Sequence, residues 1–305
     1  MSLPCWIKKK IPPAGALREM KELLRSLSLH TVCEEAACPN IGECFSQRTA
    51  TFMILGDRCT RSCRFCGVRK QNPAPPDPEE PGNIARAVRK LHLEYVVVTS
   101  PARDDLADGG ASHFAFTIKE IKKLAHGIKV EVLVPDFNGS LSSLRRVIEA
   151  GPYVLNHNLE TIPRLYPEVR PEADYARSLN LLKQSRKLDP DIYTKSGLMV
   201  GLGENEKELI EVMKDLRGVG CDILTIGQYL RPSSQNIPVK EYVPPEKFKE
   251  YEETGKSLGF LSIASSPFVR SSYQAKEIWT YPQKLQNMCQ SSTEYFLKNL
   301  TNKGK

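Results

Sequence analysis

Apolar runs and amphipathic stretches alternate along the middle of the chain. The apolar runs are six to nine residues long and rich in Val, Ile and Leu, as is typical of strands buried on both faces. The stretches between them have helical periodicity, most clearly at 205–220. The pattern predicts strands at 51–56, 95–100, 129–135, 153–160, 193–201 and 223–230.

This series of strand and helix units predicts an α/β fold, with a parallel sheet joined by right-handed crossovers. Six such units favour an incomplete (β/α)6 barrel of the TIM type over a closed eight-stranded one, and a doubly wound sheet is the alternative. We assign the barrel to residues 49–262. Residues 1–48 form an N-terminal extension and residues 263–305 a C-terminal extension, and both are expected to pack on the barrel.

Composition and cysteine content narrow the class of protein. The chain has 305 residues, of which 40% are hydrophobic and 26% charged, as in ordinary soluble enzymes. It has no run of eighteen apolar residues, and its first charges follow the apolar residues, the reverse of a secretory signal, so we expect a cytoplasmic protein. Seven of the nine cysteines lie in the first 66 residues, and this odd, crowded set favours metal binding over disulfides.

Three cysteines, Cys59, Cys63 and Cys66, follow the first predicted strand with CxxxCxxC spacing. Chemistry in parallel α/β folds sits at the carboxyl ends of the strands, which is where this loop falls. Three thiolates can hold three corners of a [4Fe-4S] cluster and leave the fourth iron open for a ligand. The alternative is zinc, which usually takes a tetrahedral set with paired CxxC or histidine ligands, and no such second pair completes the loop.

A second triplet lies upstream, where Cys33, Cys38 and Cys44 have CxxxxCxxxxxC spacing. Buried structural thiols are the alternative interpretation, but three within twelve residues favour cluster ligands. The sequence therefore predicts two [4Fe-4S] clusters.

The aromatic Phe65 precedes the last cysteine, and the resulting CxxxCxΦC loop resembles the signature of the radical S-adenosylmethionine superfamily. With the upstream triplet, the chain resembles the lipoyl synthase family. This resemblance implies that S-adenosylmethionine binds the open iron and yields a 5′-deoxyadenosyl radical. It further implies insertion of two sulfur atoms, supplied by the second cluster, at C6 and C8 of an octanoyl chain on a lipoyl carrier domain. The other blocks that carry it are 96–114, 132–137, 156–171, 195–204, 228–233 and 268–275.

The resemblance also suggests cofactor contacts beside the strand ends. Arg103, Asp104 and Asp105 follow the second strand and are expected to reach the ammonium and carboxylate groups of S-adenosylmethionine. A solvated turn or a local ion pair is the alternative. Glu160, two residues after Asn158 on one face of the fourth strand, is expected to bind ribose hydroxyls.

The fifth predicted strand brings further candidates. Lys195 and the glycines Gly197, Gly201 and Gly203 lie where backbone can approach the nucleoside closely, although a glycine pattern of this kind is weak evidence. We interpret His157, on the fourth strand, as a core histidine rather than a ligand.

The second cluster still needs a fourth ligand. Cys221 follows a helix-ending glycine and is expected in the core, while Cys5 and Cys289 lie in the terminal regions. By resemblance, the serine of the RSSY stretch at 270–273 completes the cluster, and we assign Ser272, with Ser271 as the alternative. Without the resemblance, a turn or helix-capping serine would be the simpler interpretation.

The net charge of +7 suggests how partners bind. The basic residues are most simply solvated, but a basic surface would also steer an acidic carrier domain. They are Lys8, Lys9, Lys10, Arg145, Arg146 and those of the lysine-rich C-terminal tail. The carrier is expected to be the acyltransferase subunit of a 2-oxoacid dehydrogenase or the glycine-cleavage carrier protein, and an external electron donor is needed.

Two rival functions are less consistent with the sequence. A metal-stabilised RNA-binding module should carry aromatics among its basic residues, and the run at 8–10 has none, so we expect no nucleic-acid partner. A biotin synthase or a methylthiotransferase is the rival among enzymes. Neither is expected to combine the upstream triplet with the terminal RSSY.

Overall fold

The computed structural model describes residues 3–8, 14–47 and 49–277, so Cys289, Lys9, Lys10 and the lysine-rich tail lie outside the described residues. Seven parallel strands and one antiparallel strand form the main sheet, in the order β1-β2-β5-β6-β7-β8-β9-β10, and β3 and β4 form a separate two-stranded sheet. The strands are β1 (His30–Thr31), β2 (Thr51–Met53), β3 (Arg58–Cys59), β4 (Arg69–Lys70), β5 (Tyr95–Thr99), β6 (Lys129–Leu133), β7 (Val154–Asn156), β8 (Tyr193–Val200), β9 (Ile223–Gln228) and β10 (Ser262–Ser265).

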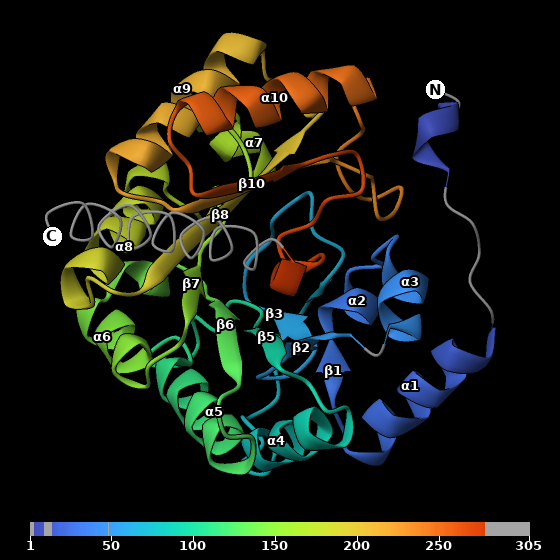
Figure 1. The fold of residues 1–305 in the computed structure, drawn as a ribbon, viewed down its shortest axis with the longest axis vertical. Coiled ribbons are helices and arrows are strands. Elements are labelled where there is room, and N and C mark those ends of the chain that lie inside the picture. The colour runs from blue at the N-terminus through green and yellow to red at the C-terminus, as the bar shows by residue number, and fades with distance from the viewer. Residues whose placement is uncertain (1–2, 9–13, 48, 278–305) are drawn as a thin grey trace, which may run out of the picture.

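Helices surround the outer side of the curved sheet (Figure 1). The last described residues, red in Figure 1, lie on its inner side. Within the described ranges, no helix is long and apolar enough to cross a membrane. The α-helices are α1 (Ala14–Ser26), α2 (Val32–Glu35), α3 (Ile41–Ser46), α4 (Glu80–Lys90), α5 (Ala111–Leu124), α6 (Leu141–Glu149), α7 (Tyr166–Val169), α8 (Tyr175–Leu188), α9 (Glu206–Gly218) and α10 (Pro245–Ser257), and the short 3-10 helices are η1 (Cys5–Ile7), η2 (Phe137–Gly139) and η3 (Pro163–Leu165).

Local signals explain where several helices begin. The side chain of Asn205 accepts a hydrogen bond from the backbone of Glu208, whose side chain accepts one from Asn205 in return, and this capping box starts α9. Ser140 and Asp174 cap α6 and α8 in the simpler way, with one side-chain bond each.

All six predicted strands are present, and the mostly parallel sheet confirms the predicted α/β class. The predicted count of six is not confirmed, because β10 pairs in parallel with β9 as a seventh strand, and β1 pairs antiparallel with β2. The predicted strand at 153–160 is also too long. It ends at Asn156, and Glu160 makes only an isolated bridge with Leu198, with the positive φ of 66° that breaks a strand.

Candidate functional site

Both cysteine triplets line one cavity of about 990 Å³. Its walls come from the N-terminal extension, the ends of the parallel strands and the last described residues, 269–277. None of these six cysteines is in a disulfide. The predicted ligands of two separate loops therefore face a common space, and both loops adjoin β2, since the N-terminal triplet precedes this strand and the CxxxCxxC loop follows it.

The CxxxCxxC loop begins from a constrained turn at the end of β2. Leu55 has a φ of +67°, a left-handed conformation that costs energy outside glycine. Its N–H donates to Glu80 Oε2 at 2.8 Å, and its carbonyl accepts from Arg103 Nη1 at 2.9 Å. Two buried ionisable side chains thus hold both polar groups of this residue. Arg103, predicted to contact the cofactor, does not line the cavity and instead supports this turn. Its guanidinium also forms an ion pair with Asp105.

Arg61, inside the CxxxCxxC loop, anchors the loop to two neighbouring strand ends. Its guanidinium donates to Asp104 at 2.7 and 2.8 Å and to Asp136 at 2.6 Å. Burial alone would raise the pKa of Asp136, but Arg61 outweighs it and holds that pKa at about 2. The hydrogen bond from Arg61 also lowers the pKa of Asp104. Asp104, another predicted cofactor contact, is therefore bound to Arg61 and is not part of the cavity lining.

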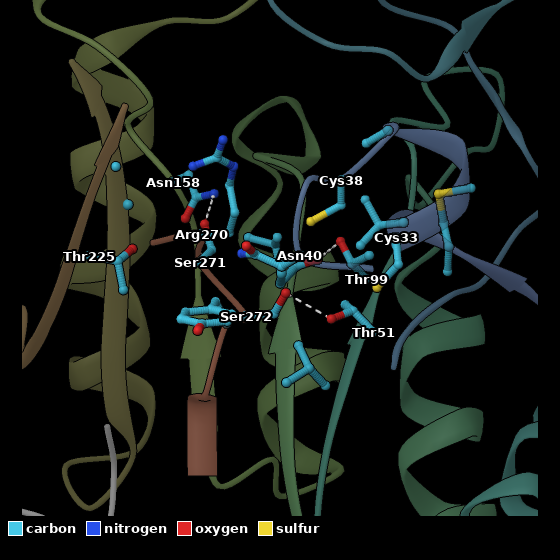
Figure 2. Close-up of a pocket in the computed structure, with 18 of the residues that line it drawn as sticks. Cys33, Cys38, Asn40, Thr51, Thr99, Asn158, Thr225, Arg270, Ser271 and Ser272 are labelled. Atoms are coloured by element: carbon cyan, nitrogen blue, oxygen red, sulfur yellow. Dashed lines mark hydrogen bonds between the residues drawn. The ribbon is translucent and has the colours of Figure 1, made fainter. Parts of the chain in front are cut away.

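The N-terminal triplet lies on α2, α3 and the turn between them, next to β2 (Figure 2). The Thr51 backbone hydrogen-bonds to Cys33, and the Thr51 hydroxyl donates to Ser272 Oγ at 2.7 Å. Thr51 therefore links Cys33 to the predicted fourth ligand. Asn40, between the second and third cysteines, donates to the carbonyl of Phe268 at 2.8 Å and ties the same loop to the C-terminal segment.

The residues after β7 give the cavity a polar wall. His157 Nδ1 lies 2.8 Å from the carbonyl oxygen of Val134, and because a carbonyl only accepts, Nδ1 carries the proton. Burial lowers the pKa of His157 to about 4, so the ring is neutral. His157 Nε2 and Asn158 Oδ1 are both buried without a protein partner among the described residues, and both residues line the cavity. They are acceptors with unused capacity.

Arginines complement this wall. Arg170, only 7% exposed, donates to the carbonyls of Asn158 and Leu159, and its charge favours the thiolate of Cys63. Burial raises the pKa of Glu160, and Arg170 and a 3.0 Å bond from Asn158 oppose that rise. Glu160 lines the cavity, but it is placed there by the turn after β7 and not by the strand face that the sequence suggests.

Three other candidates lie away from the cavity. Lys195 is 1% exposed and paired with Glu131 at 2.9 Å in the interior of the sheet. Gly201 has a φ of +95° and lies against Gln228, so its role is a tight backbone turn. Gly203 also has positive φ and does not line the cavity, whereas Gly197 does.

Sequence reasoning passed over Arg61, Asp136, Arg170 and Arg270, which all line the cavity. Arg270 lies close enough to Cys38 and Glu160 to interact with both charges. Arg61 lies inside the CxxxCxxC loop and Arg270 inside the RSSY stretch, so their place in these motifs could have identified them as site residues. Asp136 and Arg170 follow predicted strands, but nothing in the sequence shows that they face the cysteines.

The donor set suits iron-sulfur clusters. Burial raises the pKa of Cys33 and Cys66 to about 12 and of Cys63 to about 11, and it raises that of Cys59 as well, so these thiols need bound metal to become thiolates. Within residues 3–8, 14–47 and 49–277, no three His, Cys, Asp or Glu side chains are grouped closely enough to hold a single metal ion. Six cysteines around a wide cavity fit the ligand sets of clusters.

The family model of the radical SAM superfamily matches residues 53–216, and that of the N-terminal domain of lipoyl synthase matches residues 1–38. A lipoyl synthase of Caldanaerobacter subterraneus subsp. tengcongensis is 62% identical over 89% of this chain and 95% of its own length. One of Caldicellulosiruptor saccharolyticus is 58% identical over 90% of this chain and 96% of its own. Among solved structures, the crystal structure of HydG, a maturase of the [FeFe]-hydrogenase, matches the fold with a TM-score of 0.58 at 16% identity, over 82% of this chain and 63% of that one.

The curved, mostly parallel sheet with the CxxxCxxC loop after its first parallel strand is thus that of a radical S-adenosylmethionine enzyme, a class that uses a [4Fe-4S] cluster and S-adenosylmethionine. Within that superfamily, the chain belongs to the lipoyl synthase family. Both predictions of the family, made from the cysteine spacing, are confirmed.

Proposed function

We propose that this enzyme inserts two sulfur atoms at C6 and C8 of an octanoyl chain carried by a lipoyl carrier domain. The observation that supports this most directly is that both cysteine triplets line the same cavity of about 990 Å³. A saturated chain that enters this space has both sites within reach. The names of the relatives agree with this reaction.

In this proposal, Cys59, Cys63 and Cys66 hold the first [4Fe-4S] cluster. When it is bound with S-adenosylmethionine, this cluster supplies a 5′-deoxyadenosyl radical, the kind of reagent needed to take hydrogen from an unactivated methylene. The bonds of Arg61 to Asp104 and Asp136 fix the loop that presents these thiols. Preorganisation of this kind keeps the reacting groups at a set separation.

The N-terminal triplet and Ser272 hold the second cluster, which we treat as the sulfur-donating substrate. The contact of Thr51 with both Cys33 and Ser272 supports Ser272 over Ser271. Ser271 instead bonds to Asn158, on the opposite wall. An alkoxide is a harder ligand than a thiolate, so it marks one iron as different from the others.

The polar wall is proposed to orient S-adenosylmethionine. His157 Nε2 and Asn158 Oδ1 are buried acceptors with free lone pairs, which suits the hydroxyl and amino donors of the nucleoside. Glu160 is proposed to accept from the ribose hydroxyls, as expected from the sequence. The structure gives Arg103, Asp104, Lys195 and Gly201 supporting contacts instead, and we do not include them in the cofactor site.

The carrier domain and an external electron donor are the proposed macromolecular partners. Arg145 and Arg146 are exposed on α6, and Lys8 is exposed in the N-terminal extension, which is consistent with steering of an acidic carrier. As part of this proposal we keep the division into an incomplete barrel (49–262) and two extensions (1–48 and 263–305), with β10 (Ser262–Ser265) crossing the second boundary and β1 (His30–Thr31) joining the sheet from the N-terminal extension. The cytoplasmic location stays a prediction.

The experiment that tests the function is anaerobic reconstitution followed by product analysis. Iron and sulfide are counted, and an octanoylated lipoyl-domain peptide is incubated with enzyme, S-adenosylmethionine and reductant. Mass spectrometry should show the gain of two sulfur atoms on the peptide, with no change in hydrogen count for the dithiol formed under reductant and a loss of two hydrogens once it is oxidised to the cyclic disulfide. One bound zinc with no mass change would contradict the proposal.

A further inference from the structure

The two neighbouring serines of the C-terminal segment are held by opposite walls of the cavity (Figure 2). Ser271 Oγ accepts a hydrogen bond from Asn158 Nδ2 at 2.6 Å, on the wall after β7. Ser272 Oγ accepts one from Thr51 Oγ1 at 2.7 Å, on β2 beside the N-terminal triplet. One dipeptide therefore joins the wall that carries Glu160 to the wall that carries Cys33.

A socket in the sheet receives Ser271. Gly197, in the middle of β8, has no side chain, and a Cβ atom there would lie 2.8 Å from Ser271 Oγ, 2.9 Å from Asn158 Oδ1 and 2.9 Å from Thr225 Oγ1. The φ of Gly197 is not in the left-handed region, so glycine is required here for space and not for backbone conformation. On the adjacent strand β9, a Cβ on Gly227 would collide with the carbonyl of Val269. Two glycines on neighbouring strands thus make room for the segment that ends in the two serines.

Of the groups around the socket, we expect Ser271 to be the one that yields to a new side chain. Thr225 belongs to β9 in the centre of the sheet, and Asn158 is held by Glu160 at 3.0 Å. Ser271 lies on a segment outside the sheet. The Cβ of an alanine at residue 197 would have to lie about 0.5 to 0.7 Å farther from these oxygen atoms to reach ordinary contact distances. We therefore expect the Ser271 hydroxyl to be displaced by about that distance.

We propose that Ser271 is a positioning residue, which seats in the socket of Gly197, Asn158 and Thr225 and so fixes where Ser272 presents its hydroxyl to the second cluster. This inference rests on the proposed function, because it takes Ser272 as the fourth ligand. Consecutive Cα atoms are about 3.8 Å apart, so a shift of one serine is passed to the next. Metal-ligand distances hold to about 0.2 Å, which is smaller than the displacement expected from a side chain at residue 197.

The test is Gly197→Ala in the full-length enzyme, with Gly218→Ala as the matched control. Gly218 is exposed near the end of α9, and a Cβ there meets nothing within 4 Å. Two readouts are taken. Hydrogen exchange of the peptide 266–277 in the enzyme without clusters reports how firmly the segment is seated. Mössbauer spectra of the second cluster are recorded in a background in which the three cysteines of the CxxxCxxC loop are replaced by alanine.

We expect Gly197→Ala to speed exchange in 266–277 by about fivefold to tenfold, the effect of losing one local hydrogen bond. We also expect the Mössbauer component of the distinct, serine-bound iron to be lost or shifted, while Gly218→Ala matches wild type in both readouts. Ser271→Ala removes the hydroxyl without adding volume, so it should fold and change both readouts in the same direction to a smaller extent.

Wild-type exchange in both Gly197→Ala and Ser271→Ala would show that the socket does not seat the segment, and would overturn the inference while leaving the proposed function intact. Faster exchange with an unchanged Mössbauer spectrum would show seating without any effect on a ligand. That result would also overturn the inference, and would locate the failure in the assignment of Ser272. Loss of the distinct iron in Ser271→Ala but not in Ser272→Ala would make Ser271 the ligand.

Discussion

The sequence suggests that Lys195 binds the cofactor, whereas the contacts of Lys195 in the structure support the sheet. A substitution at Lys195 can distinguish these two roles. Lys195 Nζ is 2.9 Å from Glu131 Oε1, and each side chain is 1% exposed. Glu131 also accepts from Tyr95 at 2.5 Å and from Asn156 at 3.1 Å. Replacement of Lys195 by methionine would leave a buried carboxylate with only neutral donors.

Removal of one partner from a buried ion pair costs about 3 to 5 kcal/mol of folding free energy. Because Tyr95 and Asn156 still donate to Glu131, we expect the cost of Lys195→Met to lie near the lower end of that range. Unfolding entropy of about 2 cal/mol/K per residue gives about 0.6 kcal/mol/K for a chain of 305 residues. We therefore expect the melting temperature to fall by about 5 °C. Lys195→Met/Glu131→Gln should recover most of that loss, because it removes the unpaired charge.

The assay is thermal unfolding followed by circular dichroism, with 5′-deoxyadenosine formation measured well below the melting temperature. Lys187→Met, at an exposed lysine of α8, is the control and should melt like wild type. Lys195→Met should keep its KM for S-adenosylmethionine. An unchanged melting temperature together with a raised KM would refute the structural role and return Lys195 to the cofactor site.

Three further predictions follow from the site. Alanine at all three cysteines of the CxxxCxxC loop should abolish 5′-deoxyadenosine formation, whereas alanine at the N-terminal triplet should leave some cleavage and no sulfur in product; identical behaviour of the two variants would contradict the division of roles. Burial lowers the pKa of His157 to about 4, so between about pH 6.5 and 4 the imidazole binds a proton in the unfolded chain but not in the folded one. The free energy of unfolding should therefore decrease as the pH is lowered through that window, by up to about 1.4 kcal/mol per pH unit. His157→Gln should lose that part of the slope, as melting curves at pH 5.5 and 7 would show. Carrier binding, measured by calorimetry, should weaken as salt is raised because exposed charges are screened beyond about 8 Å at physiological ionic strength, and salt-independent binding would favour an apolar interface.

The parallel strands were predictable because strands covered on both faces read as continuous apolar runs, as Val96, Val97 and Val98 of β5 do. The strand β10 was missed for the opposite reason. It is four residues long, begins and ends with serine, and gains its place by pairing with β9 rather than through apolar content. The cysteine loops were predictable from spacing alone, since ligand spacing is a local property of the chain.

The sequence could not show which charged residues pair with one another. Arg103 and Lys195 follow or lie on strands at the expected end of the sheet, which made them plausible cofactor contacts. Their partners, the carbonyl of Leu55 and the carboxylate of Glu131, are 48 and 64 residues away and meet them only in the folded sheet. The same holds for the bond between Thr51 and Ser272, which spans 221 residues. Long-range pairings of this kind depend on strand order and register, and a single sequence does not contain either.

Transfer of isotopically heavy sulfur tests the central claim, that the second triplet holds a cluster whose sulfur enters the product. The enzyme is reconstituted with heavy sulfide, freed of excess, and given the octanoylated lipoyl-domain peptide, S-adenosylmethionine and reductant. The account predicts heavy sulfur at both carbons and a stop after about one product per polypeptide, because each cluster supplies its sulfur once. Repeated turnover with light sulfur from solution, in the absence of any repair protein, would contradict it.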